Sequence, residues 1–111
     1  MKIGGKERKI KAGLNQSVLF VELRGINLSD YQDVVSKIGG DNQTGSEIRD
    51  LVWSCLKDGA RISGEQFPFT NYDVGDWLET LEDGEMEKFI KEFLESMPKV
   101  KETKKKIQEK K

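Results

Sequence analysis

The sequence predicts a mainly α (α+β) fold, a small helical domain of about five helices with an N-terminal β-hairpin. Three observations predict it. Apolar residues recur at intervals of three and four over several stretches. Capping residues or glycines stand at the ends of these stretches. A Gly-Gly pair interrupts a short alternating segment near the N-terminus. With 111 residues in the chain, we assign one domain, with a small core, to residues 1–98.

The predicted hairpin occupies residues 1–13, "MKIGGKERKIKAG". Gly4 and Gly5 separate Ile3 from the alternating stretch 8–12. A glycine pair readily takes the positive φ angles of a tight hairpin turn. Because an isolated hairpin is only marginally stable in water, this one must pack against the helical body.

Residues 14–24, "LNQSVLFVELR", fit two structures. The run from Val18 to Val21 suits a buried strand. Leu14, Val18 and Val21 also have helical spacing, with Asn15 as N-cap and Gly25 as the stop. The residues alone leave both structures open, with the helix as the better fit.

Two capping boxes predict the next two helices. Ser29-x-x-Gln32 opens a helix that runs through Ile38 and ends at Gly39-Gly40. Thr44-x-x-Glu47 opens a longer one, which Asp58-Gly59 should close. Its apolar stripe has the strongest helical period in the chain and consists of Ile48, Leu51, Val52, Cys55 and Leu56.

The last two predicted helices follow a connector in which Pro68 keeps Phe67 out of helical conformation. Thr70 caps the first of them, and Phe69 and Val74 have the spacing of a hydrophobic staple. Glu82-Asp83-Gly84 separates it from a final helix over residues 86–97. We expect the core to be built from Leu51, Leu56, Trp77, Phe89 and Phe93.

Composition favours a soluble cytosolic protein. Charged residues make up 35% of the chain, and the longest apolar run, Val18 to Val21, is far shorter than the ~18 residues that a membrane span needs. The basic N-terminus lacks the apolar segment of a signal peptide. Cys55 is the single cysteine, which excludes an internal disulfide, and its place on an apolar stripe predicts a buried side chain.

The chain contains no histidine, which removes Ser-His-Asp and Cys-His catalysis and ordinary zinc sites. Asp73, Asp76 and Glu79 lie opposite an apolar stripe, so we interpret them as the solvated side of a helix rather than a carboxylate active site. Residues 41–52 resemble a calcium loop only loosely, because Gly45 replaces a ligand and Val52 stands at the twelfth position. We therefore expect no enzyme, no metal and no cofactor.

The charge is concentrated at one end. From Lys99 onward, seven lysines face two glutamates, a net charge of +5 against −6 for the rest. Residues 99–111 form a basic tail, either disordered or helical, with three interpretations. It is a solvated end, a helix that docks on a partner or neighbouring subunit, or a nucleic-acid contact through Lys104, Lys105 and Lys106. The last is least favoured, because arginine and aromatic residues are absent from the tail.

From Leu51 to Pro98, "LVWSCLKDGARISGEQFPFTNYDVGDWLETLEDGEMEKFIKEFLESMP" resembles the tail assembly chaperones of long-tailed bacteriophages and prophages. The similarity extends over about residues 3–98 in the order of elements: a hairpin, a helix over 15–24, a helix ending "LKDGAR", then "FPFTNYDVGDWLE" and an amphipathic helix. It favours the helix for residues 14–24. The segments 29–38 and 39–45 have no clear counterpart in that pattern.

The resemblance implies a non-enzymatic chaperone in the bacterial host cytoplasm. Such proteins bind the tape measure protein, a long amphipathic helical chain, and assist polymerisation of the tail tube protein around it. Self-association is a further expected interaction. We expect partner contacts from Phe67 and Tyr72, two aromatic residues in or beside the connector, and from Lys104, Lys105 and Lys106. The alternative is a small helical nucleic-acid-binding or regulatory module that acts through the basic C-terminal tail.

Overall fold

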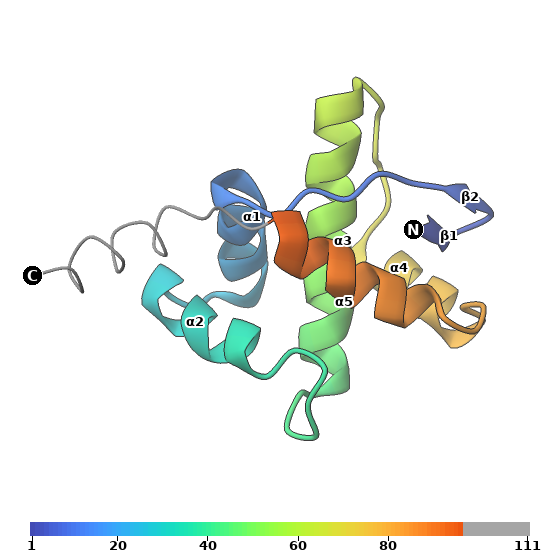
Figure 1. Ribbon diagram of the computed structural model, residues 1–111. Coiled ribbons are helices and arrows are strands. Elements are labelled where there is room, and N and C mark those ends of the chain that lie inside the picture. Colours follow the sequence, from blue (N-terminus) through green and yellow to red (C-terminus); the bar gives the residue numbers. More distant parts are fainter. Residues whose placement is uncertain (97–111) are drawn as a thin grey trace, which may run out of the picture.

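The computed structural model describes residues 1–96 and confirms a helical fold with an N-terminal two-stranded hairpin (Figure 1). Residues 14–24 are helical, as the resemblance favours. The predicted basic tail, residues 99–111, lies outside the described part. The elements, in chain order, are β1 (Lys2–Ile3), β2 (Lys6–Glu7), α1 (Leu14–Arg24), α2 (Leu28–Ser36), α3 (Gly45–Ser63), α4 (Asn71–Glu79) and α5 (Glu85–Ser96).

Helix α3 is the longest element and lies at the centre (Figure 1). It packs against α1 on one side and α4 on the other. Its predicted apolar stripe is buried except for Ile48, which is half-buried, and it shares one core with Phe89 and Phe93 of α5, which are fully buried. The predicted core is therefore confirmed except for Trp77, which is half-buried at the rim.

The predicted Thr44 box and the predicted Thr70 cap are confirmed. At the start of α3, the Glu47 N–H donates to Thr44 Oγ1 (3.2 Å), and the Thr44 N–H donates to Glu47 Oε1 (3.1 Å). At the start of α4, Thr70 and Asp73 exchange the same pair of bonds at 3.1 and 2.8 Å. These reciprocal bonds satisfy backbone donors that the first helical turn leaves unpaired.

The predicted caps of the first two helices, Asn15 and Ser29, are each wrong by two residues. Helix α1 begins at Leu14 with Gly13 as N-cap, so Asn15 is already inside the helix. Helix α2 begins at Leu28 with Asn27 as N-cap, where Asp30 Oδ2 accepts the Asn27 N–H at 3.3 Å. In both helices an earlier residue, Gly13 or Asn27, is the N-cap, and the helix begins directly after it.

Gly59 does not end α3, contrary to the prediction. The helix continues to Ser63 and stops at Gly64, whose φ of 74° lies in the left-handed region. Gly59 is buried where the N-terminal segment crosses α3, and a Cβ atom there would overlap the carbonyl oxygen of Lys9. The glycine is needed for this close approach of two backbones.

The hairpin is shorter than predicted, with Lys2 paired to Glu7 and Ile3 paired to Lys6. Beyond the strands, the Arg8 N–H donates to the Met1 carbonyl at 2.8 Å. The following residues cross α3, where the Lys11 N–H donates to the Cys55 carbonyl at 3.1 Å. The hairpin packs on the helices as expected. Ile3 is buried, and the Lys2 N–H donates to Glu85 Oε1 of α5 at 2.8 Å.

Candidate partner-binding surface

Tyr72 is the most exposed large aromatic side chain described, with 70% of its surface accessible. It lies in the first turn of α4, and the Arg49 guanidinium of α3 sits 5.0 Å from its ring centroid. A cation at this distance holds an aromatic ring in place without burying it. The expected exposure of Tyr72 is therefore confirmed, and its contact with a partner stays a prediction.

Asp50 holds the Arg49 guanidinium that lies against the Tyr72 ring. It is only 3% exposed, yet its carboxylate accepts hydrogen bonds from side chains of three different helices. Arg24 Nη1 of α1 donates to Oδ2 at 2.8 Å, while Arg49 Nε and Asn71 Nδ2 donate to Oδ1 at 2.8 and 2.9 Å. The bond to Asp50 raises the pKa of Arg49 and fixes the guanidinium under Tyr72.

Phe67 is buried, so the expectation that it is a half-exposed contact is wrong. It is 8% exposed, and its ring packs edge-on against Phe69 (5.2 Å between centroids) and Trp77 (6.3 Å). The cause is a bond that holds the connector against α3, in which Trp53 Nε1 donates to the Phe69 carbonyl at 3.0 Å. Phe67 therefore stabilises the connector rather than meeting a partner.

A pocket lies farther along α3, about two helical turns beyond Asp50. It has a volume of about 340 Å³ and is lined by Leu19 of α1, by three α3 residues and by the connector residues Glu65 and Phe67. The α3 residues are Lys57, Asp58 and Arg61. Asp58 is 1% exposed, and Arg61 Nε donates to its Oδ1 at 2.6 Å. Within residues 1–96, Oδ2 of Asp58 has no hydrogen-bond partner.

Tyr72 and this pocket lie at the two ends of one surface strip. We call it the α3 face and define it by Trp53, Lys57 and Arg61, whose spacing of four places them on one side of the helix, with the buried residues Asp50 and Asp58 beside them. Helix α1 borders one side of α3 and the connector and α4 border the other (Figure 1). Between the ends, the Lys57 ammonium lies 5.8 Å from the half-buried Trp53 ring.

The sequence analysis gave no role to Asp50 and predicted only that Asp58, with Gly59, ends the helix. A signal is nevertheless present. Asp50, Ser54 and Asp58 follow each other at intervals of four, directly beside the buried positions Leu51 and Cys55. Polar residues in that register lie at the margin of a wide buried arc, where they need partners.

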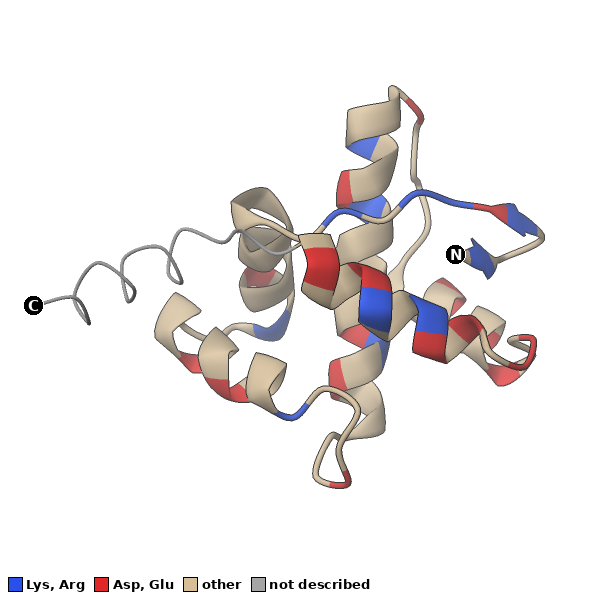
Figure 2. Cartoon of the chain, viewed as in Figure 1, with Lys and Arg blue, Asp and Glu red and all other residues tan. Residues whose placement is uncertain are grey.

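The carboxylates of α4 have the predicted solvated role. Asp73 is engaged in the cap with Thr70, and Asp76 and Glu79 are exposed. Figure 2 shows acidic residues gathered around the turn between α4 and α5. Within the described residues, no group of three or more side chains is placed to hold a metal ion. Cys55 is fully buried as predicted, and burial raises the pKa of its thiol.

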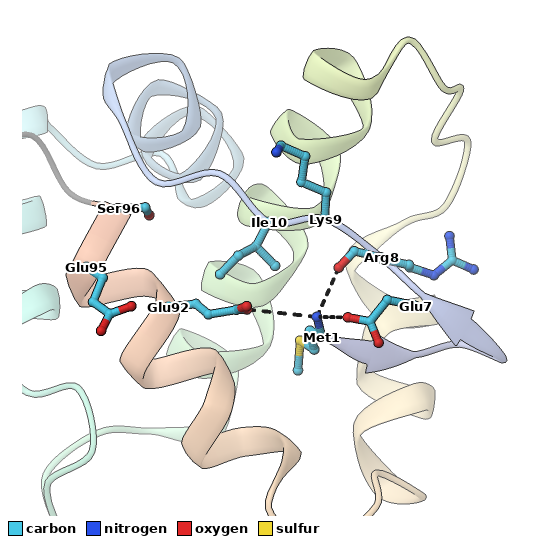
Figure 3. Close-up of a pocket in the computed structure, with 8 residues that line it drawn as sticks. All are labelled: Met1, Glu7, Arg8, Lys9, Ile10, Glu92, Glu95 and Ser96. Carbon is cyan, nitrogen blue, oxygen red and sulfur yellow. Dashed lines mark hydrogen bonds and ion pairs between the residues drawn. The ribbon is translucent and has the colours of Figure 1, made fainter.

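A second cleft, of about 490 Å³, separates the hairpin from α5 (Figure 3). The Met1 amino group points into it, 2.7 Å from Glu7 Oε2, 3.1 Å from the Arg8 carbonyl and 3.8 Å from Glu92. The bond from Met1 lowers the pKa of Glu7. The Met1 amino group pairs with Glu7 of β2 and with Glu92 of α5, so these ion pairs connect the hairpin to α5 across the cleft.

Comparison of the chain with protein-family models, with curated proteins and with solved structures gave no match. Among the helices of residues 1–96, none is long and apolar enough to cross a membrane. The predicted contacts Lys104, Lys105 and Lys106 lie outside the described residues. The candidate surface therefore consists of the α3 face and the adjoining Tyr72.

Proposed function

We propose that this protein is a tail assembly chaperone of a long-tailed phage or prophage, which binds the tape measure protein in the bacterial cytoplasm by protein contact alone and assists tail tube polymerisation. The resemblance over residues 51–98 motivates the proposal. The observation that carries it is the α3 face, where an exposed ring, Tyr72, is held on a rigid charged base next to half-buried apolar side chains.

The chemistry of this surface suits an amphipathic helix. Tyrosine and arginine are the residue types that most often dominate protein interfaces, and here Arg49 and Tyr72 form one unit. The Trp53 ring, with the Lys57 ammonium 5.8 Å from its centroid, adds half-buried apolar surface bordered by a charge. An apolar helical stripe that would otherwise aggregate is covered by such a surface.

Weak attachment of each copy fits the proposed task. A long tape measure chain offers many similar segments, so many chaperone copies can cover it at once. Each copy then leaves singly as a tube subunit replaces it. A modest, partly polar face, rather than a large apolar one, is suited to this exchange.

The proposal is tested by co-expressing the protein with fragments of the tape measure protein, which the proposal expects to be encoded immediately downstream, followed by co-purification at moderate salt. We expect an otherwise insoluble helical fragment to become soluble and to co-elute. The Glu79→Gln variant is the matched control, because Glu79 is exposed on α4 away from the capping bonds and its loss should leave co-elution unchanged. Absence of co-elution with every fragment overturns the proposal.

The alternative function, nucleic-acid or regulatory binding through the basic tail, predicts a different outcome of the same experiment. The protein would then retain nucleic acid during purification, and added salt would remove it, since phosphate contacts weaken steeply with ionic strength. The −6 charge of the remaining chain disfavours this function.

A further inference from the structure

Helix α2 is lightly attached to the rest of the fold. Of its nine residues, Tyr31 and Val34 are the buried ones, and the helix packs mainly on α1. Its sequence is rich in serine, aspartate and valine, which are weak helix formers, and nine residues are too few for a stable isolated helix in water. Helix α2 is therefore helical because of the surface that it covers.

That surface holds the side chain of Tyr31. The ring packs edge-on against Phe20 of α1, with 5.4 Å between the centroids. The hydroxyl accepts a hydrogen bond from Gln16 Nε2 at 3.0 Å and donates to Gln16 Oε1 at 3.2 Å. Gln16 Nε2 also donates to Ser54 Oγ of α3 at 2.9 Å, which fixes the amide in place. We call the surface formed by the buried residues Gln16 and Phe20 the α2 seat.

Glycines stand on both sides of α2. The φ angles of Gly25 and Gly39 are 69° and 81°, in the left-handed region, where glycine adopts new backbone angles at little cost. Among residues 1–96, the other side-chain hydrogen bond from segment 26–40 to a different helix joins Lys37 Nζ to Glu47 Oε2 at 2.9 Å. Rotation at the two glycines can therefore move α2 while the other helices stay in place.

We infer that α2 opens as a unit and that the open α2 seat binds an amphipathic helix of the partner. The present occupant shows the chemistry of the ligand. It is a helix with an aromatic hydroxyl at one position and a branched apolar side chain three residues later, as in Tyr31 and Val34. The identity of this helix, a segment of the tape measure protein, rests on the proposed function. The α2 seat is then a second contact, separate from the α3 face.

Competition with α2 controls how tightly the partner is held. A site that is open for only a fraction of the time binds with an affinity reduced by that fraction. Closure of α2 also refills the α2 seat as soon as the partner leaves. Such a competing helix keeps each attachment weak, as the replacement of chaperone copies by tube subunits requires.

Opening is measured by native-state hydrogen exchange of the full chain, followed by NMR. We expect the amides of Val34 and Val35 in α2 to be protected at least about 100-fold less than those of Leu51 and Val52 in α3. Equal protection in the two helices would mean that α2 opens only when the whole protein unfolds, and the inference would be wrong.

Tyr31→Phe tests whether the hydroxyl holds α2 closed. The change removes both hydrogen bonds to Gln16 and keeps the ring against Phe20. Exchange in α2 should become about tenfold faster, with exchange in α3 unchanged. Tyr72→Phe is the matched control, because it removes a hydroxyl from a side chain that is 70% exposed and should alter neither helix. An equal increase in α2 and α3 after Tyr31→Phe would contradict separate opening.

Asp33→Pro holds the α2 seat open in the full chain. Asp33 is exposed, and proline there interrupts the helix without changing a buried side chain. Asp33→Ala, which removes the same carboxylate and keeps the helix, is the control. We expect a peptide with the sequence of residues 27–38 to bind Asp33→Pro at least about tenfold more tightly than Asp33→Ala, with shifts of the Gln16 and Phe20 signals. Global unfolding of Asp33→Pro, or no binding of the peptide to it, overturns the inference.

The same pair of variants tests the partner. The co-purified tape measure fragment should bind Asp33→Pro about tenfold more tightly than Asp33→Ala, because α2 no longer competes. If the fragment binds both variants equally, the partner does not use the α2 seat, and the inference fails while the chaperone proposal stands. If no fragment binds but the peptide does, the proposed function fails and the α2 seat stands as a helix-binding site.

Discussion

Asp50 and Asp58 are two buried aspartates on the same helix, and their surroundings differ sharply. Asp50 accepts three hydrogen bonds, from α1, from α3 and from the start of α4. Asp58 accepts one, from Arg61 three residues later on its own helix. A carboxylate that joins three helices fixes their arrangement. Asp58 pairs only within α3, so it contributes little to that arrangement.

The largest expected effect comes from Asp50→Ala. Removal of the carboxylate leaves Arg24, Arg49 and Asn71 without their shared acceptor, and the contact between α1, α3 and α4 loosens. We expect a loss of about 2–4 kcal/mol in the free energy of unfolding, below the full cost for a buried pair because both arginines reach solvent. Urea denaturation measures it.

Asp58→Leu is the matched comparison for that change. Arg61 is more than half exposed, so water can hydrate it once Asp58 is gone. Replacing a buried carboxylate that lacks one partner with an apolar side chain should leave stability within about 1 kcal/mol or raise it. If both aspartates cost the same on removal, the distinction between the two ends of α3 is wrong.

Gly59→Ala should destabilise the protein by a different mechanism, a steric collision in the second half of α3. The new methyl group would collide with the Lys9 backbone, which cannot move aside as a flexible side chain would. We expect a loss of about 1–3 kcal/mol, seen as a lower melting temperature. Gly45→Ala is the control, because no atom outside its own neighbourhood lies within 4 Å and alanine favours a helix by up to about 1 kcal/mol. A gain in stability at both positions would show that helix propensity decides the result and that the collision at Gly59 is absent.

Helix α3 shows what the sequence alone can predict, because its presence was predicted correctly and its end was not. The period of the apolar stripe and the Thr44 box correctly predicted a helix, because both depend on local spacing. The end of the helix was predicted too early, at Asp58-Gly59, since this dipeptide is typical of a turn. The true reason for Gly59 is contact with Lys9, fifty residues earlier in the chain, and no local pattern reports such a contact.

The same limit applies to the candidate surface. Tyr72 was predicted because a tyrosine after a proline-containing connector has few local partners, and the structure leaves it exposed. Phe67 belongs to the same connector but is buried by a distant bond, from the Trp53 indole to the Phe69 carbonyl. Asp50 was missed because two of its donors, Arg24 and Asn71, come from helices that spacing alone does not bring together. The burial of Asp58 was missed because it depends on packing between elements, while its partner Arg61 is local.

Glu47 makes the stability of the first half of α3 dependent on pH. It lies in the first turn of the helix, in the half whose polar groups are paired. Burial raises its pKa, but the Lys37 ammonium at 2.9 Å and the Thr44 N–H outweigh this and leave the pKa below its usual value. A lowered pKa means that the ionised form stabilises the fold above about pH 4.3 and that this stability is lost as pH falls through the folded-state value.

The corresponding variant is Glu47→Gln. At pH 7 it should lose roughly 0.5–2 kcal/mol, because the charged part of the cap and the ion pair disappear. Urea denaturation at pH 7 and pH 3 should show a smaller acid loss in Glu47→Gln than in the parent. An identical acid loss would assign that loss to other carboxylates, such as Glu85, whose pKa the Lys2 N–H lowers.

Tyr72→Ala should have the smallest effect on stability and therefore separates surface from core most clearly. With 70% of the side chain exposed, the change should alter the free energy of unfolding by no more than about 0.5 kcal/mol. Affinity for the tape measure fragment should fall by about tenfold, since an aromatic anchor is lost from the α3 face. Tyr72→Phe keeps the ring over Arg49 and should retain most of that affinity. Isothermal titration and thermal melting of the same samples measure both quantities, and a parallel loss of affinity and melting temperature would place Tyr72 in the packing of α4 instead.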